Sequence, residues 1–183
     1  QLSINPPLII DGVNGGAYSL SVSATGFTII GGVEAGVFYG LQSLRALVPV
    51  SNFKNKGERL QLDFCEIKDA PRFEYRGLHL DVVRNFQKKK DALRLIDMMG
   101  FYKLNKFHFH ITDDEGWRLA IKGLPELTDV GARRGHSKDE AEMINPAYGS
   151  GPYPSEESNG TGYYSREDFI EILKYAKERH VEV

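Results

Sequence analysis

The fold of this chain is decided by the segments YRGLHLDVVRNF (residues 75–86) and KFHFHITDDEGW (residues 106–117), with a helical pattern over residues 88–100 between them. Each quoted segment begins as a strand and ends in charged or polar side chains. A helix between two strands predicts a parallel pair, whose carboxyl ends lie at the same edge of a sheet. Because ligands of α/β folds bind at that edge, we expect the functional site there.

The sequence that follows continues the alternation of strand and helix. Residues 122–164 form a long stretch rich in Gly, Pro, Ser and Glu, for which we expect an irregular, functional loop. Ser165 and Asp168 have the spacing of a capping box, which predicts a helix to about Arg179. Val181–Val183 is expected to start a third strand, so we expect these 183 residues to be a piece of a larger barrel or doubly wound domain.

The sequence before residue 70 has a different pattern. An alternating run and a β-branched run predict a hairpin, and apolar residues at helical spacing then predict an amphipathic helix that Pro49 ends. We expect no firm element in residues 1–16 and a polar loop over residues 52–59. The predicted elements are strands at residues 17–23, 27–30 and 60–67 and a helix at residues 33–47.

A boundary is expected at residues 69–72, which gives two parts. Residues 1–69 are predicted to be a partial α+β domain, and residues 70–183 the first strand–helix units of an α/β domain.

The net charge of −2 argues against a nucleic-acid partner. No apolar run approaches the roughly 20 residues of a membrane span.

Arg76 and the pair Asp81 and Arg84 are the charged groups of the first segment. An arginine in an apolar strand needs an anionic or polar partner, because burying it alone is costly. The residues leave two interpretations of Arg76 open, a donor to a ligand's hydroxyl or carboxylate groups and a structural ion pair with Asp81. For Asp81 and Arg84 we favour an architectural pair at the end of the strand.

The second segment carries His108 and His110 on one face of a strand. Such a pair can ligate a metal, but a complete site needs further ligands, and neither His79, His136 nor His180 has a convincing context. We therefore expect no metal and no cofactor, with the two histidines in supporting or core positions.

Asp113 and Asp114 close the same strand. Asp113 is expected either to orient a histidine or general acid at a pocket rim or to serve the turn. Trp117 is expected to cover the core rather than to stack on a sugar.

Several motifs resemble one enzyme family over nearly the whole chain. APRFxxRGxxLDxxR (residues 70–84) and KLNxFHxHxTDDxGWR (residues 103–118) resemble the opening of the catalytic barrel of family 20 glycoside hydrolases, the β-N-acetylhexosaminidases. EAGVFYGLQSL (residues 34–44) resembles the helix of the small domain before that barrel, and ERHVEV (residues 178–183) resembles the approach to its third strand.

The resemblance implies a fold, an activity and roles for particular residues. It implies the N-terminal part of a (β/α)₈ barrel and retaining hydrolysis of terminal β-linked N-acetylglucosamine or N-acetylgalactosamine, assisted by the substrate's own acetamido oxygen. By the resemblance, Arg76 grips the hydroxyls of the sugar ring, Asp113 orients a histidine that lies near the general acid and is missing from these 183 residues, and His110 is a supporting residue. A glycan is the implied partner, and an exported or lysosomal location is implied for the enzyme.

One departure from the family is large. The catalytic Asp-Glu pair of the family follows Gly-Gly, and the Asp-Glu dipeptides here, Asp114-Glu115 and Asp139-Glu140, do not. We therefore expect a truncated enzyme that is inactive by itself. The alternatives are a non-catalytic carbohydrate-binding protein and a metal-dependent barrel hydrolase that uses His108 and His110.

Overall fold

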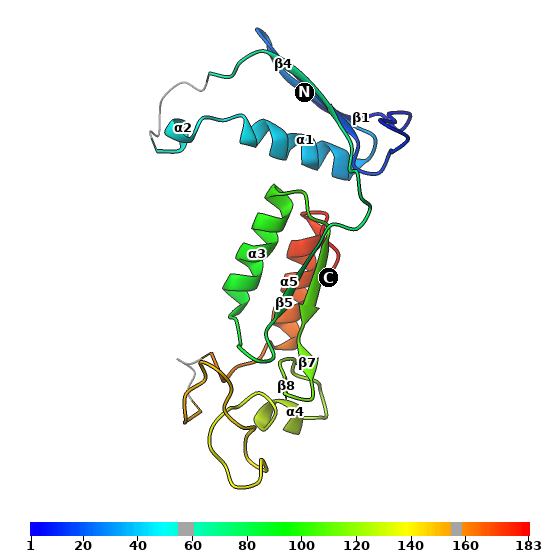
Figure 1. Cartoon of the computed structure of the whole chain (residues 1–183). Helices are drawn as coiled ribbons and strands as arrows, with labels where there is room; N and C mark the ends of the chain where they lie inside the picture. The colour runs from blue at the N-terminus through cyan, green and yellow to red at the C-terminus, as the bar shows by residue number, and fades with distance from the viewer. Residues whose placement is uncertain (55–60, 155–158) are drawn as a thin grey trace. The chain divides into compact units, whose positions relative to one another are not determined.

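The computed structural model describes residues 1–54, 61–154 and 159–183, and its described residues form two compact units. The N-terminal unit consists of Gln1–Arg76 together with Gly100–Lys103, and the C-terminal unit of Gly77–Met99 together with Leu104–Val183. Figure 1 shows the elements of each unit along the chain. Each unit is described by itself below.

The N-terminal unit is built on a four-stranded sheet of order β1-β3-β2-β4. The predicted hairpin is confirmed as β2 (Tyr18–Ser23) paired antiparallel with β3 (Gly26–Gly31). β4 (Cys65–Asp69) pairs with the other edge of β2, so the strand expected from residue 60 begins at Cys65, and Leu60 lies outside the described residues. β1 (Leu2–Ile4) pairs parallel with β3 in a stretch for which we expected no element.

The predicted amphipathic helix is confirmed as α1 (Glu34–Ala46). Its buried Tyr39 packs with Tyr18, Leu20 and Ile29 of the sheet. The chain after Pro49 differs from expectation, because α2 (Val50–Lys54) is helical where we expected a loop from residue 52. The rest of that loop, residues 55–60, lies outside the described residues.

Lys103 inserts its ammonium group into a polar network of the N-terminal unit. Its Nζ donates to the Ser43 side-chain oxygen at 2.7 Å and to the Tyr18 hydroxyl at 2.8 Å, and it lies 3.1 Å from Asp69 Oδ2. Tyr18 donates in turn to Asp69 Oδ2 at 2.8 Å. Burial of the Tyr18 phenol raises its pKa, so the hydroxyl keeps its proton and can make this bond.

Replacing Lys103 by methionine is expected to destabilise the N-terminal unit by about 1–3 kcal/mol, because the polar groups of α1, β2 and β4 lose a shared charged donor. Urea unfolding of the variant measures the change. Lys90→Met removes an exposed lysine of α3 and serves as the matched control. Equal stability of the two variants would contradict a structural role for this network.

The predicted strand–helix–strand unit is confirmed in the C-terminal unit. β5 (Gly77–Asp81) and β6 (Lys106–His110) pair in parallel, and α3 (Lys89–Phe101) connects them along the chain. The expected third strand is present as a parallel bridge of Lys106 with Glu182, in which the Phe107 amide donates to the Glu182 carbonyl at 2.7 Å.

Two helices cover one face of these strands. α5 (Arg166–Lys177) begins with the predicted capping box, in which Ser165 and Asp168 bond each other's backbone amides at 3.0 and 3.1 Å. The buried core contains residues from α3, α5 and the strands, among them Ile96, Ile172 and Phe107. The N-terminal unit is therefore an α+β layer, and the C-terminal unit begins a β/α domain, as expected.

The stretch after β6 is mostly irregular, as predicted. It holds a two-residue hairpin of β7 (Thr112–Asp113) and β8 (Gly116–Trp117), and the short helix α4 (Glu126–Asp129). The indole N–H of Trp117 donates to the Leu119 carbonyl at 2.6 Å in a partly buried position, in agreement with a structural rather than a stacking role.

Candidate active site at the carboxyl edge of β5 and β6

Polar side chains gather where β5 and β6 end. Asp81 and His110 are the last residues of the two strands and stand opposite each other in the parallel register. Arg84 follows Asp81 by three residues, and Asp113 follows His110 by three. We call Asp81, Arg84, His110, Asp113 and Glu115 the carboxyl-edge cluster. Parallel pairing brings its members together although 34 residues separate Asp81 from Glu115.

Asp81 is held in place by the chain that follows it. Its Oδ1 accepts the amides of Val83 at 2.8 Å and Arg84 at 3.2 Å, and its Oδ2 lies 2.6 Å from Arg84 Nη1. Burial alone raises the pKa of this carboxyl, but the bonds from Arg84 and the two amides outweigh burial and lower the pKa overall. Asp81 is therefore a charged, oriented anchor for Arg84, which agrees with the architectural pair that the sequence indicates.

Arg84 is the cation of the cluster and contacts three carboxylates. Besides Asp81, its Nη1 lies 3.3 Å from Asp113 Oδ2 and its Nε lies 3.3 Å from Glu115 Oε2. The hydrogen bond with Asp81 raises the pKa of Arg84, so the guanidinium is always charged. The side chain stays 43% exposed. A fixed, accessible fork of donors among carboxylate acceptors suits a neutral ligand with several hydroxyl groups.

Asp113 orients His110. Its Oδ2 lies 2.6 Å from His110 Nε2, and its Oδ1 accepts the Glu115 amide at 2.7 Å in the β7–β8 turn. The Asp113 side chain is only 15% exposed. The two interpretations of Asp113 therefore hold together, because one oxygen serves the turn and the other fixes an imidazole. The sequence analysis expected Asp113 to orient a histidine outside these 183 residues, and the structure shows a contact of Asp113 with His110 within the chain.

Arg118 lies beneath the cluster and is fully buried, with 0% exposure. Its guanidinium donates hydrogen bonds of 2.7–3.2 Å to backbone carbonyl oxygens of five residues, Val82, Val83, Ala132, Gly160 and Gly162. Burial lowers its pKa to about 10, so the side chain is still protonated at neutral pH. Arg118 thus ties the end of β5 to both ends of the long irregular stretch.

Arg134 supports the same region from the long stretch. Its guanidinium donates to the carbonyl oxygens of Glu115 at 2.5 Å and Asn145 at 2.8 Å. Burial lowers the pKa of Arg134. Neither Arg118 nor Arg134 was singled out from the sequence, because nothing in a local pattern tells a buried arginine from an exposed one.

Arg76 is not part of the carboxyl-edge cluster. It immediately precedes the amino end of β5, and it belongs with Lys103, Phe73 and Tyr39 to the N-terminal unit. Its guanidinium donates to the Lys103 and Phe73 carbonyl oxygens at 2.7 Å and to the Tyr39 hydroxyl at 3.0 Å. The hydrogen bonds of Arg76 are therefore of a structural kind. They join it to Lys103, Phe73 and Tyr39 and not to Asp81, the partner that the sequence indicated. The structure gives Arg84 the position expected of a ligand-binding arginine.

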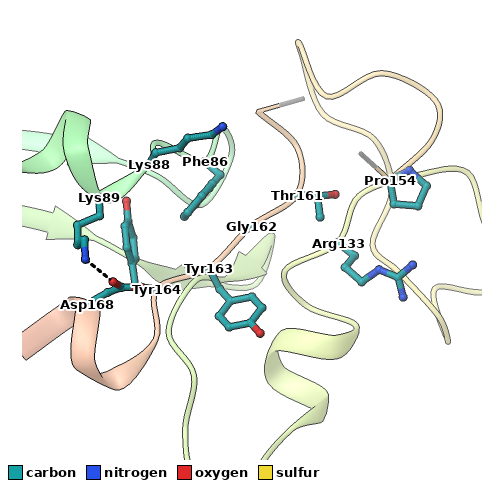
Figure 2. A pocket seen from close by; sticks show the side chains of 10 residues that line it. All are labelled: Phe86, Lys88, Lys89, Arg133, Pro154, Thr161, Gly162, Tyr163, Tyr164 and Asp168. Atoms are coloured by element: carbon teal, nitrogen blue, oxygen red, sulfur yellow. Dashed lines mark ion pairs between the residues drawn. The ribbon is translucent and has the colours of Figure 1, made fainter. Parts of the chain in front are cut away.

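A separate cavity of about 660 Å³ opens elsewhere in the C-terminal unit. Figure 2 shows its lining, with Lys89 directed at Asp168 across a 2.7 Å ion pair. The hydrogen bond that Lys89 donates to the Asp168 carboxylate raises the pKa of Lys89 to about 12. This pair joins the first turns of α3 and α5. Since no member of the carboxyl-edge cluster lines the cavity, we treat it as a packing feature of these two helices.

Comparison with protein-family models identifies both parts of the chain. Residues 73–183 match the catalytic domain of glycosyl hydrolase family 20, and residues 5–70 match domain 2 of the same family. The chain belongs to glycosyl hydrolase family 20. The two family 20 matches meet between residues 70 and 73, where the sequence indicated a boundary, whereas the compact units divide after Arg76.

Individual family 20 proteins are similar over nearly the whole chain. The Vibrio vulnificus β-hexosaminidase is 48% identical over 168 residues, which cover 92% of this chain and 19% of that protein. The N,N'-diacetylchitobiase of Vibrio harveyi is also 48% identical over 168 residues, which cover 92% of this chain and 18% of that protein. The chain thus spans about a fifth of the length of these relatives.

Solved structures of family 20 proteins have a fold similar to that of this chain. The exo-β-N-acetylglucosaminidase of Vibrio harveyi in complex with N-acetylglucosamine matches 98% of this chain with a TM-score of 0.81 and 35% identity, over 26% of that chain. The β-N-acetylhexosaminidase of Streptomyces coelicolor matches with a TM-score of 0.78 and 34% identity, over 32% of that chain.

Of the helices in the described residues, none has the length and apolar character to cross a bilayer.

Proposed function

We propose that the complete polypeptide carrying this chain removes terminal β-linked N-acetylhexosamine from glycans by retaining, substrate-assisted hydrolysis. Membership of family 20 supports the reaction class, and relatives named as hexosaminidases and chitobiases support the sugar. The observation that carries the proposal is the carboxyl-edge cluster, which lies at the strand ends where barrel enzymes bind their substrates. The Vibrio harveyi relative in complex with N-acetylglucosamine supports this sugar as a ligand.

In this proposal Arg84 takes the role that the resemblance first suggested for Arg76. Its guanidinium donates to two ring hydroxyls of the sugar, while Asp81 fixes its direction through the 2.6 Å contact. Hydroxyl groups also donate, and the carboxylates of Asp113 and Glu115 are acceptors beside Arg84. Such a mixed set of donors and acceptors recognises a neutral polyol rather than an anion.

His110 and Asp113 are proposed as positioning residues. The 2.6 Å contact between Asp113 Oδ2 and His110 Nε2 fixes the direction of the His110 ring. The proposed reaction also needs a general acid and a carboxylate that orients the acetamido group, one protonated and one charged. The resemblance assigns these roles to a Gly-Gly-Asp-Glu motif, which is not among these 183 residues.

The test compares two aryl glycosides as substrates of the protein expressed from its complete reading frame. An aryl β-N-acetylglucosaminide is expected to be hydrolysed, and the aryl β-glucoside is not, because it lacks the acetamido oxygen that attacks the anomeric carbon. The 183-residue chain by itself is expected to hydrolyse neither.

Three results would contradict the proposal. Equal rates of hydrolysis of both glycosides would show that the acetamido oxygen of the substrate does not assist the reaction. Turnover by the 183-residue chain alone would show that the acid lies within it. Binding of N-acetylglucosamine by the complete protein without any turnover would favour the carbohydrate-binding alternative.

A further inference from the structure

Arg134 is a buried arginine, with 4% exposure, that connects several parts of the C-terminal unit. Its Nη1 donates to the Asn145 carbonyl oxygen at 2.8 Å, and its Nη2 donates to that of Glu115 and lies 3.4 Å from that of Val83. Its backbone amide donates to Thr161 Oγ1 at 3.2 Å. One residue therefore links the chain just after β5, the β7–β8 turn and two points of the long irregular stretch.

The β7–β8 turn needs contacts from outside to hold its position. Its two strands have two residues each, and so short a hairpin is not stable by itself. The turn nevertheless carries two carboxylates that contact Arg84, those of Asp113 and Glu115. Arg84 holds the turn through these side chains, and Arg134 holds its backbone through the Glu115 carbonyl oxygen. The direction of the Arg84 side chain therefore depends on where Arg134 places the turn.

The position of Arg134 is costly for a residue that serves stability alone. Its Nη2 and that of Arg118 approach the same Val83 carbonyl oxygen, at 3.4 and 2.7 Å, so two like charges lie side by side inside the protein. Among the buried side-chain polar atoms of the described residues, Arg134 Nε is left without a hydrogen-bond partner. Both features cost free energy, and local costs of this kind are typical of functional positions.

The charge of Arg134 is balanced by the carboxyl-edge cluster. Burial lowers the pKa of Arg134, whereas the carboxylates of Glu115 and Asp113 oppose this shift. Apart from His110, the cluster holds three carboxylates and one guanidinium, and the buried guanidiniums of Arg118 and Arg134 supply two further positive charges. Arg134 thus shares the carboxylates of the turn with Arg84 and acts on them from the buried side.

On the basis of the proposed function, in which Arg84 donates to hydroxyl groups of the sugar, we propose that Arg134 is a positioning residue for sugar binding. It fixes the β7–β8 turn, so that Asp113 and Glu115 keep Arg84 in the direction that the sugar requires. Arg134 touches no substrate, because it is buried and its hydrogen bonds go to backbone carbonyl groups. These contacts are internal to the C-terminal unit and do not depend on which surfaces are exposed.

The test is a double-mutant cycle in the protein expressed from its complete reading frame, with kcat/KM for an aryl β-N-acetylglucosaminide as the readout. Arg134→Met is expected to lower kcat/KM by about 10- to 100-fold, the effect of a displaced binding group. In the Arg84→Ala background the same change is expected to lower it less than about threefold, because the arginine that Arg134 positions is gone. A loss of stability alone would lower kcat/KM by the same factor in both backgrounds.

The separate values of KM and kcat provide a second readout. Partial unfolding lowers the apparent kcat and leaves KM unchanged, whereas a misdirected Arg84 raises KM, by about tenfold in Arg134→Met. Arg133→Met removes the exposed neighbouring arginine and is expected to leave both constants unchanged. Ile172→Val shortens a fully buried side chain of α5, so it is expected to lower the unfolding midpoint with KM unchanged.

The cycle is repeated with the milder Arg134→Lys, so that the outcome does not depend on the folding of the methionine variant. Lysine keeps the charge but cannot reach several carbonyl groups at once, and its smaller loss of kcat/KM is likewise expected to disappear in the Arg84→Ala background. Equal losses in both backgrounds, or an unchanged KM, would overturn the role of Arg134 while the proposed function stands. An unaltered protein that hydrolyses no aryl glycoside would overturn the proposed function, and the role of Arg134 with it.

Discussion

Replacing Arg84 by alanine in the complete protein is expected to lower kcat/KM for an aryl β-N-acetylglucosaminide by about two to three orders of magnitude. Loss of charged hydrogen bonds to sugar hydroxyls costs about 3–4 kcal/mol of transition-state binding. The same change leaves Asp81 and Asp113 without the cation that they contact at 2.6 and 3.3 Å. The repulsion between the two carboxylates adds to the loss.

Steady-state kinetics at several substrate concentrations measure this effect, and Arg76→Ala is the matched comparison. Arg76 bonds to Lys103, Phe73 and Tyr39, so its removal is expected to lower the unfolding midpoint more than it lowers kcat/KM. The opposite pattern, with Arg84→Ala fully active and Arg76→Ala folded but inactive, would restore the role that the resemblance gives to Arg76.

Replacing Arg118 by methionine is expected to destabilise the C-terminal unit by about 3–5 kcal/mol, because carbonyl oxygens of five residues lose their donor inside the protein. The methionine fills much of the space but donates no hydrogen bond. The connection between the end of β5 and residues 132, 160 and 162 would then be lost. Arg118→Lys is expected to recover only part of the stability, since an ammonium cannot match the planar fork.

Urea unfolding of the complete protein measures the loss, with Arg94→Met as control. Arg94 is an exposed residue of α3, and its replacement is expected to change the free energy of unfolding by less than about 0.5 kcal/mol. If Arg118→Met unfolded at the same urea concentration as Arg94→Met, the buried hydrogen bonds would contribute no net stability.

The helices and the parallel pair were predictable because their signals are local. α1 and α5 follow an apolar stripe of helical period, and the capping box at Ser165 marks the first residue of α5. The polar residues at the carboxyl ends of β5 and β6 indicated a functional site at that edge of the sheet. Asp113 was a candidate for the same reason, although its contact with His110 was not predicted, because we expected it to orient a histidine outside this chain.

The elements and residues that were missed depend on distant partners. β1 has three residues and exists through its pairing with β3, so no periodicity marks it. Arg118 is explained by carbonyl groups up to 44 residues away, which sequence spacing does not reveal. The sequence likewise did not show which of Arg76 and Arg84 is the ligand-binding arginine, because this depends on which end of β5 each side chain lies at.

Lys103 has a consequence for the order of events during synthesis. The N-terminal unit includes Gly100–Lys103, so it is discontinuous along the chain. When residue 70 leaves the ribosome, the network around Tyr18 and Asp69 still lacks its ammonium group. The unit therefore reaches its final hydrogen bonding only after β5 and α3 have been translated. The usual sequence, in which the first domain is finished before the next begins, does not hold here.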